Sequence, residues 1–95
     1  MSAYFVIEID VKDPEVYAEY VKMAPAAVKH YGGKYLVRGG KAEIMEGEGE
    51  PKRIVVLEFE SVEKGKEWLN SPEYQPARAL RQGAATARMI LVEGA

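Results

Sequence analysis

Two stretches of the chain, residues 4–11 and 53–60, alternate between hydrophobic side chains and a more polar set. Because successive side chains of a strand point to opposite faces of a sheet, this period of two predicts two strands. In each strand one face is wholly apolar, and we expect this face to lie against helices. The apolar faces consist of Phe5, Ile7, Ile9 and Val11 in the first strand and of Val55, Leu57 and Phe59 in the second.

Between the predicted strands, apolar residues recur at the three- and four-residue spacing of helices. The first helix is expected to begin after Asp13, which can cap its free amides, and to end at the glycines 32–33. Pro25 lies inside this stretch, and we expect a kink or a break there, because proline removes a helical hydrogen bond. A second helical region is predicted after the capping residue Ser61, and it continues as a separate piece over residues 76–82.

The other strands are predicted from shorter apolar runs. Residues 34–38 form the second strand, and the glycines 39–40 suggest a bulge or a close approach of the backbone. We expect the strand to resume over residues 41–46 and to turn at residues 47–51. The last strand, residues 87–93, is apolar on both faces, as expected for a strand between two layers.

Taken in order, the pattern predicts strand, helix, strand, strand, helix and strand. The two halves are alike, because residues 56–60 repeat the apolar and acidic pattern of residues 6–10. Such a βαββαβ chain builds a ferredoxin-like α+β fold, an antiparallel sheet with both helical regions on one face. We expect residues 1–95 to form a single domain of this kind.

The opposite face of the predicted sheet has no helix to cover it. It carries the largely apolar set Tyr4, Val6, Ile54 and Val56. Burying a valine or isoleucine stabilises a fold by roughly 1.5–3 kcal/mol, a large share of what a small protein has. We therefore expect a homodimer whose exposed sheet faces pack together into a barrel-like core. Glu8 and Glu58 would lie near this interface, with Lys41 or Arg53 as partners.

The composition narrows the classes of partner. Fifteen acidic and thirteen basic residues give a net charge of −2 without a basic stripe, so we expect no nucleic-acid partner. The chain has no cysteine, which fits a reducing cytoplasm. Residues 1–4 lack the basic flank of a signal peptide, and no apolar run approaches about 20 residues, so we expect no signal peptide and a cytoplasmic protein without a membrane partner. One histidine with dispersed carboxylates makes no ligand cluster, and we expect neither a metal nor a cofactor.

Five motifs resemble a small bacterial family known only as a domain of unknown function. They are Tyr-Leu-Val-Arg-Gly-Gly at 35–40, Glu-Gly at 46–47, Arg-Ile-Val-Val-Leu-Glu-Phe at 53–59, Ser-Pro-Glu-Tyr-Gln at 71–75 and Ile-Leu-Val-Glu-Gly at 90–94. That family belongs to the dimeric α/β-barrel superfamily, so the resemblance implies a ferredoxin-like subunit and a dimer. Relatives in the superfamily include cofactor-independent monooxygenases, an isomerase, haem-degrading oxygenases and stress-response proteins, and fold alone does not choose among them.

Four residues are candidates for binding a small organic ligand between helices and sheet: Arg38, Tyr20, Tyr74 and Arg81. Arg38 precedes two glycines at a strand break, where a fixed cation suits a carboxylate or an enolate. Tyr20 and Tyr74 can line an aromatic pocket. The alternatives are a salt bridge for Arg38, core packing for the tyrosines, and pairing with surface acids for Arg81.

His30 is the only histidine and a weak candidate for catalysis. A cation is also favoured at the negative end of a helix, so a solvated or structural role is the alternative. If His30 or a tyrosine moved a proton, the protein would be a cofactor-independent monooxygenase or isomerase of aromatic or polyketide-like acids. A structural or regulatory dimer without a ligand is the third interpretation. An open aromatic pocket with Arg38 at its rim would favour a ligand, and a water-free gap would favour the third interpretation.

Overall fold

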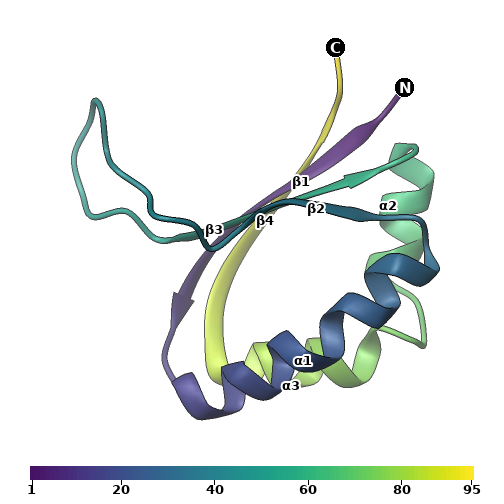
Figure 1. Ribbon diagram of the computed structural model, residues 1–95, viewed down its shortest axis with the longest axis horizontal. Helices are drawn as coiled ribbons and strands as arrows, with labels where there is room; N and C mark the ends of the chain where they lie inside the picture. Colours follow the sequence, from purple (N-terminus) through teal and green to yellow (C-terminus); the bar gives the residue numbers. More distant parts are fainter.

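The computed structural model describes residues 1–95 and contains four strands and three helices. In chain order the elements are β1 (Ala3–Val11), α1 (Pro14–His30), β2 (Lys34–Arg38), β3 (Arg53–Phe59), α2 (Val62–Leu69), α3 (Gln75–Ala84) and β4 (Ala85–Glu93). The sheet is antiparallel throughout, with the order β2-β3-β1-β4. All three helices lie on one face of this sheet (Figure 1). The predicted ferredoxin-like α+β arrangement is confirmed.

The core lies between the helices and the predicted apolar strand faces. Phe5, Leu57 and Phe59 are at most 2% exposed, and the other helix-facing residues of β1 and β3 are buried or nearly so. Trp68 of α2 is fully buried, with its ring centroid 5.2 Å from that of Phe5 and 5.4 Å from that of Phe59. These edge-on and tilted aromatic contacts join α2 to the middle of the sheet.

Helix α1 begins at the predicted cap, because the Asp13 carboxylate accepts a hydrogen bond from the Val16 amide at 3.2 Å. The expected break at Pro25 is wrong, since α1 continues to His30. Two features compensate for the lost helical hydrogen bond. One face of the helix around Pro25 is buried against the sheet, and the Val21 carbonyl accepts a hydrogen bond from Arg38 instead.

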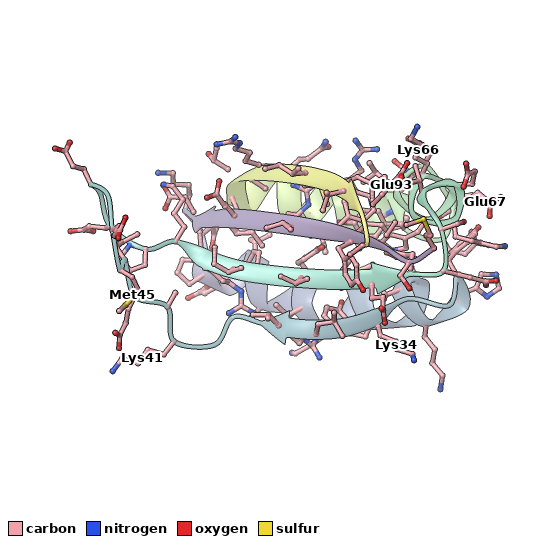
Figure 2. All side chains as sticks on the ribbon, turned by 90° about the horizontal axis from the view of Figure 1, so that it is seen from above. Lys34, Lys41, Met45, Lys66, Glu67 and Glu93 are labelled. Atoms are coloured by element: carbon pink, nitrogen blue, oxygen red, sulfur yellow. The ribbon has the colours of Figure 1, made fainter.

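Strand β2 is short, and its bulge lies between Tyr35 and Val37 and not at the glycines 39–40; the alternative prediction there, a close approach of the backbone, is confirmed at Gly39, which packs against Arg53. The predicted resumption of a strand over residues 41–46 is also wrong. Residues 39–52, which we call the arm, contain no helix or strand and project beyond the end of the sheet (Figures 1 and 2). Residues 41–46 pair with no neighbouring strand, and Gly47 and Gly49, in the predicted turn just beyond them, have φ near +100°, outside the extended conformation.

The helix-free face of the sheet, which we call the open face, is largely apolar at its centre (Figure 2). Cross-strand pairing places Val6 between Val56 of β3 and Ile90 of β4. Ile90 is 42% exposed, and Val92, which pairs with Tyr4, is 47% exposed. The prediction that this face carries uncovered apolar side chains is confirmed.

The two repeated carboxylates of the open face find partners on their own sheet. Glu8 lies 3.7 Å from the Arg88 guanidinium, and Glu58 accepts a hydrogen bond from the Tyr4 hydroxyl at 3.0 Å. The predicted partners, Lys41 and Arg53, are wrong. Cross-strand register explains the difference, because Glu8 pairs directly with Arg88 and Tyr4 pairs directly with Glu58.

Candidate functional site

A narrow cavity lies between α1 and the sheet. Its volume is about 20 Å³, which is room for roughly one water molecule. Nine of its eleven lining residues are hydrophobic, and the other two are arginines. The lining includes the phenol rings of Tyr17, Tyr20 and Tyr35 and the guanidinium groups of Arg38 and Arg53. An apolar cleft with a few convergent polar groups is the usual form of a small-molecule site.

Strand register places both arginines on the helix side of the sheet. Arg53 shares the alternation of Val55 and Leu57, so its side chain leaves β3 toward α1. Tyr35 pairs with Leu57, and Arg38 pairs with Val55, because the bulge inserts an extra residue between them. Without the bulge, residues 35 and 38 would point to opposite faces.

Arg38 bridges β2 and α1. Its Nη2 donates a hydrogen bond to the Val21 carbonyl oxygen at 3.1 Å, and its Cζ lies 4.6 Å from the centre of the Tyr35 ring. The alternative of a salt bridge with a neighbouring acid is not what the structure shows, because no carboxylate pairs with this guanidinium. The charge of Arg38 is therefore free for an anion.

Arg53 also lines the cavity and lies over the Tyr17 ring, with 5.5 Å between Cζ and the ring centre. Gly39, at φ +73°, packs its backbone directly against this guanidinium, where any Cβ would collide with it. The Nε of Arg53 is buried and has no hydrogen-bond partner. A buried donor without an acceptor is unfavourable and marks a position for a water or a ligand atom.

A line of hydrogen bonds leads from the cavity into the core. The Tyr20 and Tyr74 hydroxyls are 2.8 Å apart, and Arg81 Nε donates to the Tyr74 hydroxyl at 3.3 Å. Tyr20 is 9% exposed, Tyr74 is fully buried, and Arg81 is 6% exposed. Burial, followed by the Tyr74 hydroxyl, raises the pKa of Tyr20 above its usual value, so this phenol stays neutral at physiological pH.

Of the four predicted ligand-binding residues, Arg38 and Tyr20 line the cavity, and Tyr74 and Arg81 support Tyr20 from behind. Three further lining residues that the site uses, Tyr17, Tyr35 and Arg53, were not among the four candidates. The alternation of β3 was a sufficient signal for Arg53, because it shares the parity of Val55. Tyr35 could not be paired with Arg38 from alternation alone, since the bulge was not visible in the sequence.

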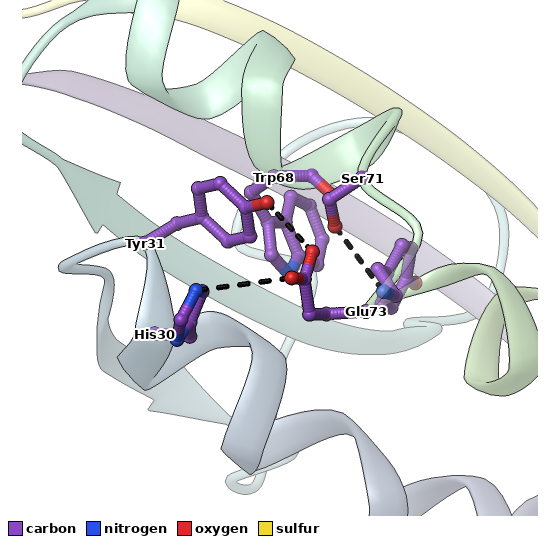
Figure 3. Close-up of polar contacts among 6 residues, drawn as sticks. His30, Tyr31, Trp68, Ser71 and Glu73 are labelled. Atoms are coloured by element: carbon purple, nitrogen blue, oxygen red, sulfur yellow. Dashed lines mark hydrogen bonds and ion pairs between the residues drawn. The ribbon is translucent and has the colours of Figure 1, made fainter.

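His30 lies outside the cavity, at the exposed end of α1. Figure 3 shows His30 and Tyr31 directed at Glu73, with His30 Nε2 at 3.8 Å and a 2.7 Å hydrogen bond from the Tyr31 hydroxyl. The bond from Tyr31 lowers the pKa of Glu73, and His30 adds a smaller effect. This cluster ties α1 to the segment before α3. No group of three or more carboxylate or imidazole side chains gathers where a metal could be held.

The fold occurs in several solved structures of low sequence identity. A protein of unknown function from Rhodopseudomonas palustris is 20% identical, with a TM-score of 0.81 over 99% of this chain and 82% of that chain. The cofactor-independent oxygenase SnoaB from Streptomyces nogalater is 12% identical, with a TM-score of 0.69 over 99% and 93%. A dimeric ferredoxin-like protein of unknown function from Jannaschia sp. CCS1 is 11% identical, with a TM-score of 0.68 over 99% and 100%. These likenesses show the fold.

No functionally curated protein shows significant similarity to the sequence. None of the three helices is both long and apolar enough to cross a membrane. The model of one protein family matches residues 2–95, nearly the whole chain. The family expected from the five sequence motifs is thereby confirmed in kind, and the chain belongs to the family described as Domain of unknown function (DUF1330).

Proposed function

We propose that this protein binds a small organic molecule in the cavity between α1 and the sheet. The observation that carries the proposal is the meeting of three phenol rings with two arginines, one of which has a buried and unpaired Nε. In this proposal Arg38 and Tyr20 contact the ligand, whereas Tyr74 and Arg81, which were also candidates for ligand binding, do not line the cavity. Tyr74 and Arg81 hold the Tyr20 ring in place.

The cavity is smaller than the roughly 300–1,000 Å³ of typical ligand pockets, so binding requires it to open. The side chain that must move is exposed and held at its tip by one hydrogen bond, from Arg38 to the Val21 carbonyl. Exposed side chains change rotamer in picoseconds to nanoseconds, so the movement of the Arg38 side chain does not limit the rate of binding. The structural or regulatory interpretation without a ligand predicts a closed, water-free gap, and it stands if the cavity does not open to a ligand.

A fragment screen tests the proposal. Small aromatic compounds, both charged and neutral, are added to isotope-labelled protein, and the ring signals of Tyr17, Tyr20 and Tyr35 are followed by NMR. We expect some compounds to shift these signals together, and Tyr20→Leu to abolish the effect. If no fragment shifts them at millimolar concentration, the cavity is not a binding site.

The oxygenase or isomerase alternative requires a residue that transfers a proton, and neither His30 nor Tyr20 is suited to that role. Its proton-transfer candidate, His30, is exposed and pairs with Glu73 instead. The Tyr20 phenol stays neutral, so it is a poor general base. Oxygen uptake with phenolic acids as substrates, lost in His30→Ala, would restore this alternative.

We infer that the open face packs against a second copy of the chain. The support is the exposed apolar side chains of Val92 and Ile90 next to Val6 and Val56, and the dimeric state of the ferredoxin-like neighbour from Jannaschia. Sedimentation at micromolar concentration should give a dimer for the native chain and a monomer for Val56→Asp, which puts a charge at the centre of the face. A monomeric native chain would refute the inference.

A further inference from the structure

Pro25 leaves one carbonyl of α1 without its helical donor. In a regular helix the carbonyl of Val21 accepts a hydrogen bond from the amide of residue 25, but proline has no N–H. The structure shows what replaces that donor: Arg38 Nη2 lies 3.1 Å from the Val21 oxygen. A single residue of α1 therefore creates the acceptor that holds Arg38, and we call the Arg38–Val21 hydrogen bond the latch.

The latch lies across the mouth of the cavity. Arg38 leaves β2, passes over the Tyr35 ring, and reaches α1, so its side chain spans the gap between sheet and helix. Both Val21 and Arg38 line the cavity. While the latch is formed, the space beneath it holds about one water molecule. A ligand that enters between β2 and α1 must therefore displace Arg38.

Ligands differ in how well they can displace Arg38. A carboxylate forms an ion pair with a guanidinium and often accepts two parallel hydrogen bonds from it, whereas the Val21 carbonyl is uncharged and accepts one. It can therefore compete with the Val21 carbonyl for Arg38, whereas a neutral ligand must break the latch without a replacement. Arg53 adds a second cation at the same cavity, and its buried Nε has no partner that an incoming oxygen would have to displace.

We propose that the ligand is a small carboxylic acid with an apolar ring, and that its carboxylate opens the cavity by taking Arg38 from the Val21 carbonyl. The proposal rests on the proposed binding site and adds the chemical class of the ligand and the means of opening. The ring lies among Tyr17, Tyr20 and Tyr35, and the carboxylate lies between the two arginines. Pro25 is a positioning residue, because it acts on the ligand only through Val21 and Arg38.

Benzoate and its neutral isostere benzamide are the probes. Each is titrated into the native full-length chain, with binding followed by calorimetry and by the ring signals of Tyr17, Tyr20 and Tyr35. We expect benzoate to bind at least roughly tenfold more tightly than benzamide. Equal affinities with shifted ring signals would overturn the carboxylate class and leave the binding site standing. Unshifted ring signals with both probes would overturn the site as well.

Arg38→Met separates the latch from simple packing. The variant loses the charge and the latch together, so benzoate should bind about tenfold more weakly while benzamide binds severalfold more tightly. Lys22→Gln is the matched control, because it removes one positive charge beside Val21 on the exposed surface of α1. We expect it to leave both affinities unchanged. Equal weakening of both probes in Arg38→Met would overturn the latch.

Pro25→Ala tests the origin of the latch with the charge of Arg38 intact. The new amide at residue 25 can donate to the Val21 carbonyl, so Arg38 is released and both probes should bind roughly three- to tenfold more tightly. A purely structural role for Pro25 would change the unfolding midpoint and leave the affinities alone, and that result overturns its positioning role. If the variant does not fold, the opposite responses of the two probes in Arg38→Met still decide the proposal.

Discussion

Replacing Tyr74 by phenylalanine removes one hydroxyl from the buried line that supports the cavity wall. The Tyr74 hydroxyl lies 2.8 Å from that of Tyr20 and accepts a hydrogen bond from Arg81 Nε at 3.3 Å. Without it, two buried polar groups lose a partner, and each such loss costs about 1–3 kcal/mol. We expect Tyr74→Phe to lower the free energy of unfolding by about 2–4 kcal/mol, a large fraction of the stability of a small protein.

Tyr20→Phe is the second arm of a double-mutant cycle. It leaves the Tyr74 hydroxyl bonded to Arg81, so we expect a smaller loss of about 1–2 kcal/mol. In the double variant the Tyr20 hydroxyl is no longer present to be left unpaired. The combined loss should therefore fall short of the sum of the single losses by about 1–2 kcal/mol.

Urea denaturation followed by the emission of Trp68 measures all three variants, because Trp68 is the only tryptophan and its ring lies 4.3 Å from that of Tyr74. Protein concentration is held constant, since dimer formation would add to the apparent stability. Tyr31→Phe is the control, because its hydroxyl bonds Glu73 at the surface, and its midpoint should stay near that of the native chain. Losses that add within about 0.5 kcal/mol would show that the two hydroxyls are not energetically paired.

Three further predictions concern the core, the glycine beside Arg53, and pH. Leu57→Ala, at a 2% exposed core position, should cost about 2–5 kcal/mol in urea denaturation, and a cost below about 1 kcal/mol would refute its placement. Gly39→Ala should displace Arg53 and weaken benzoate binding in calorimetry, because φ is +73° and the new Cβ meets the guanidinium. Burial raises the folded pKa of Tyr20 above 10.0, so its contribution to stability is full below pH 10 and lost as pH rises through the folded pKa. Urea midpoints between pH 9 and 11 should fall less steeply in Tyr20→Phe, and an unchanged slope would contradict this.

The strand faces and the architecture could be read from the sequence because each depends on local alternation. Phe5, Leu57 and Phe59 are buried where the period of two places them, and the caps at Asp13 and Ser61 form as predicted. The apolar open face followed from the same alternation. These features can be predicted without knowing which strands are neighbours, so the amino-acid sequence alone was sufficient.

The candidate site could be predicted only in part, because it depends on register. The bulge in β2 places Arg38 and Tyr35 on the same face of the sheet. No residue type between them indicates a bulge in the sequence. Pro25 was visible in the sequence as a disturbance of α1, but the partner of the freed Val21 carbonyl comes from a strand that only the fold brings near. The arm was mistaken for a strand because its apolar residues resemble one, although no neighbouring strand pairs with it.

The proposed ligand site and the proposed dimer surface lie on opposite faces of the sheet, and the chain connections keep them apart. Arg38 ends β2 and Arg53 begins β3, so the two cations of the site are also the two ends of the arm. The Gly39 amide donates to the Ile54 carbonyl at 2.8 Å and closes the base of the arm just beyond the cavity. This bond fixes the spacing of the two arginines independently of the arm's shape. Contacts of the open face with the proposed second copy would therefore leave the proposed ligand site on the helix side undisturbed.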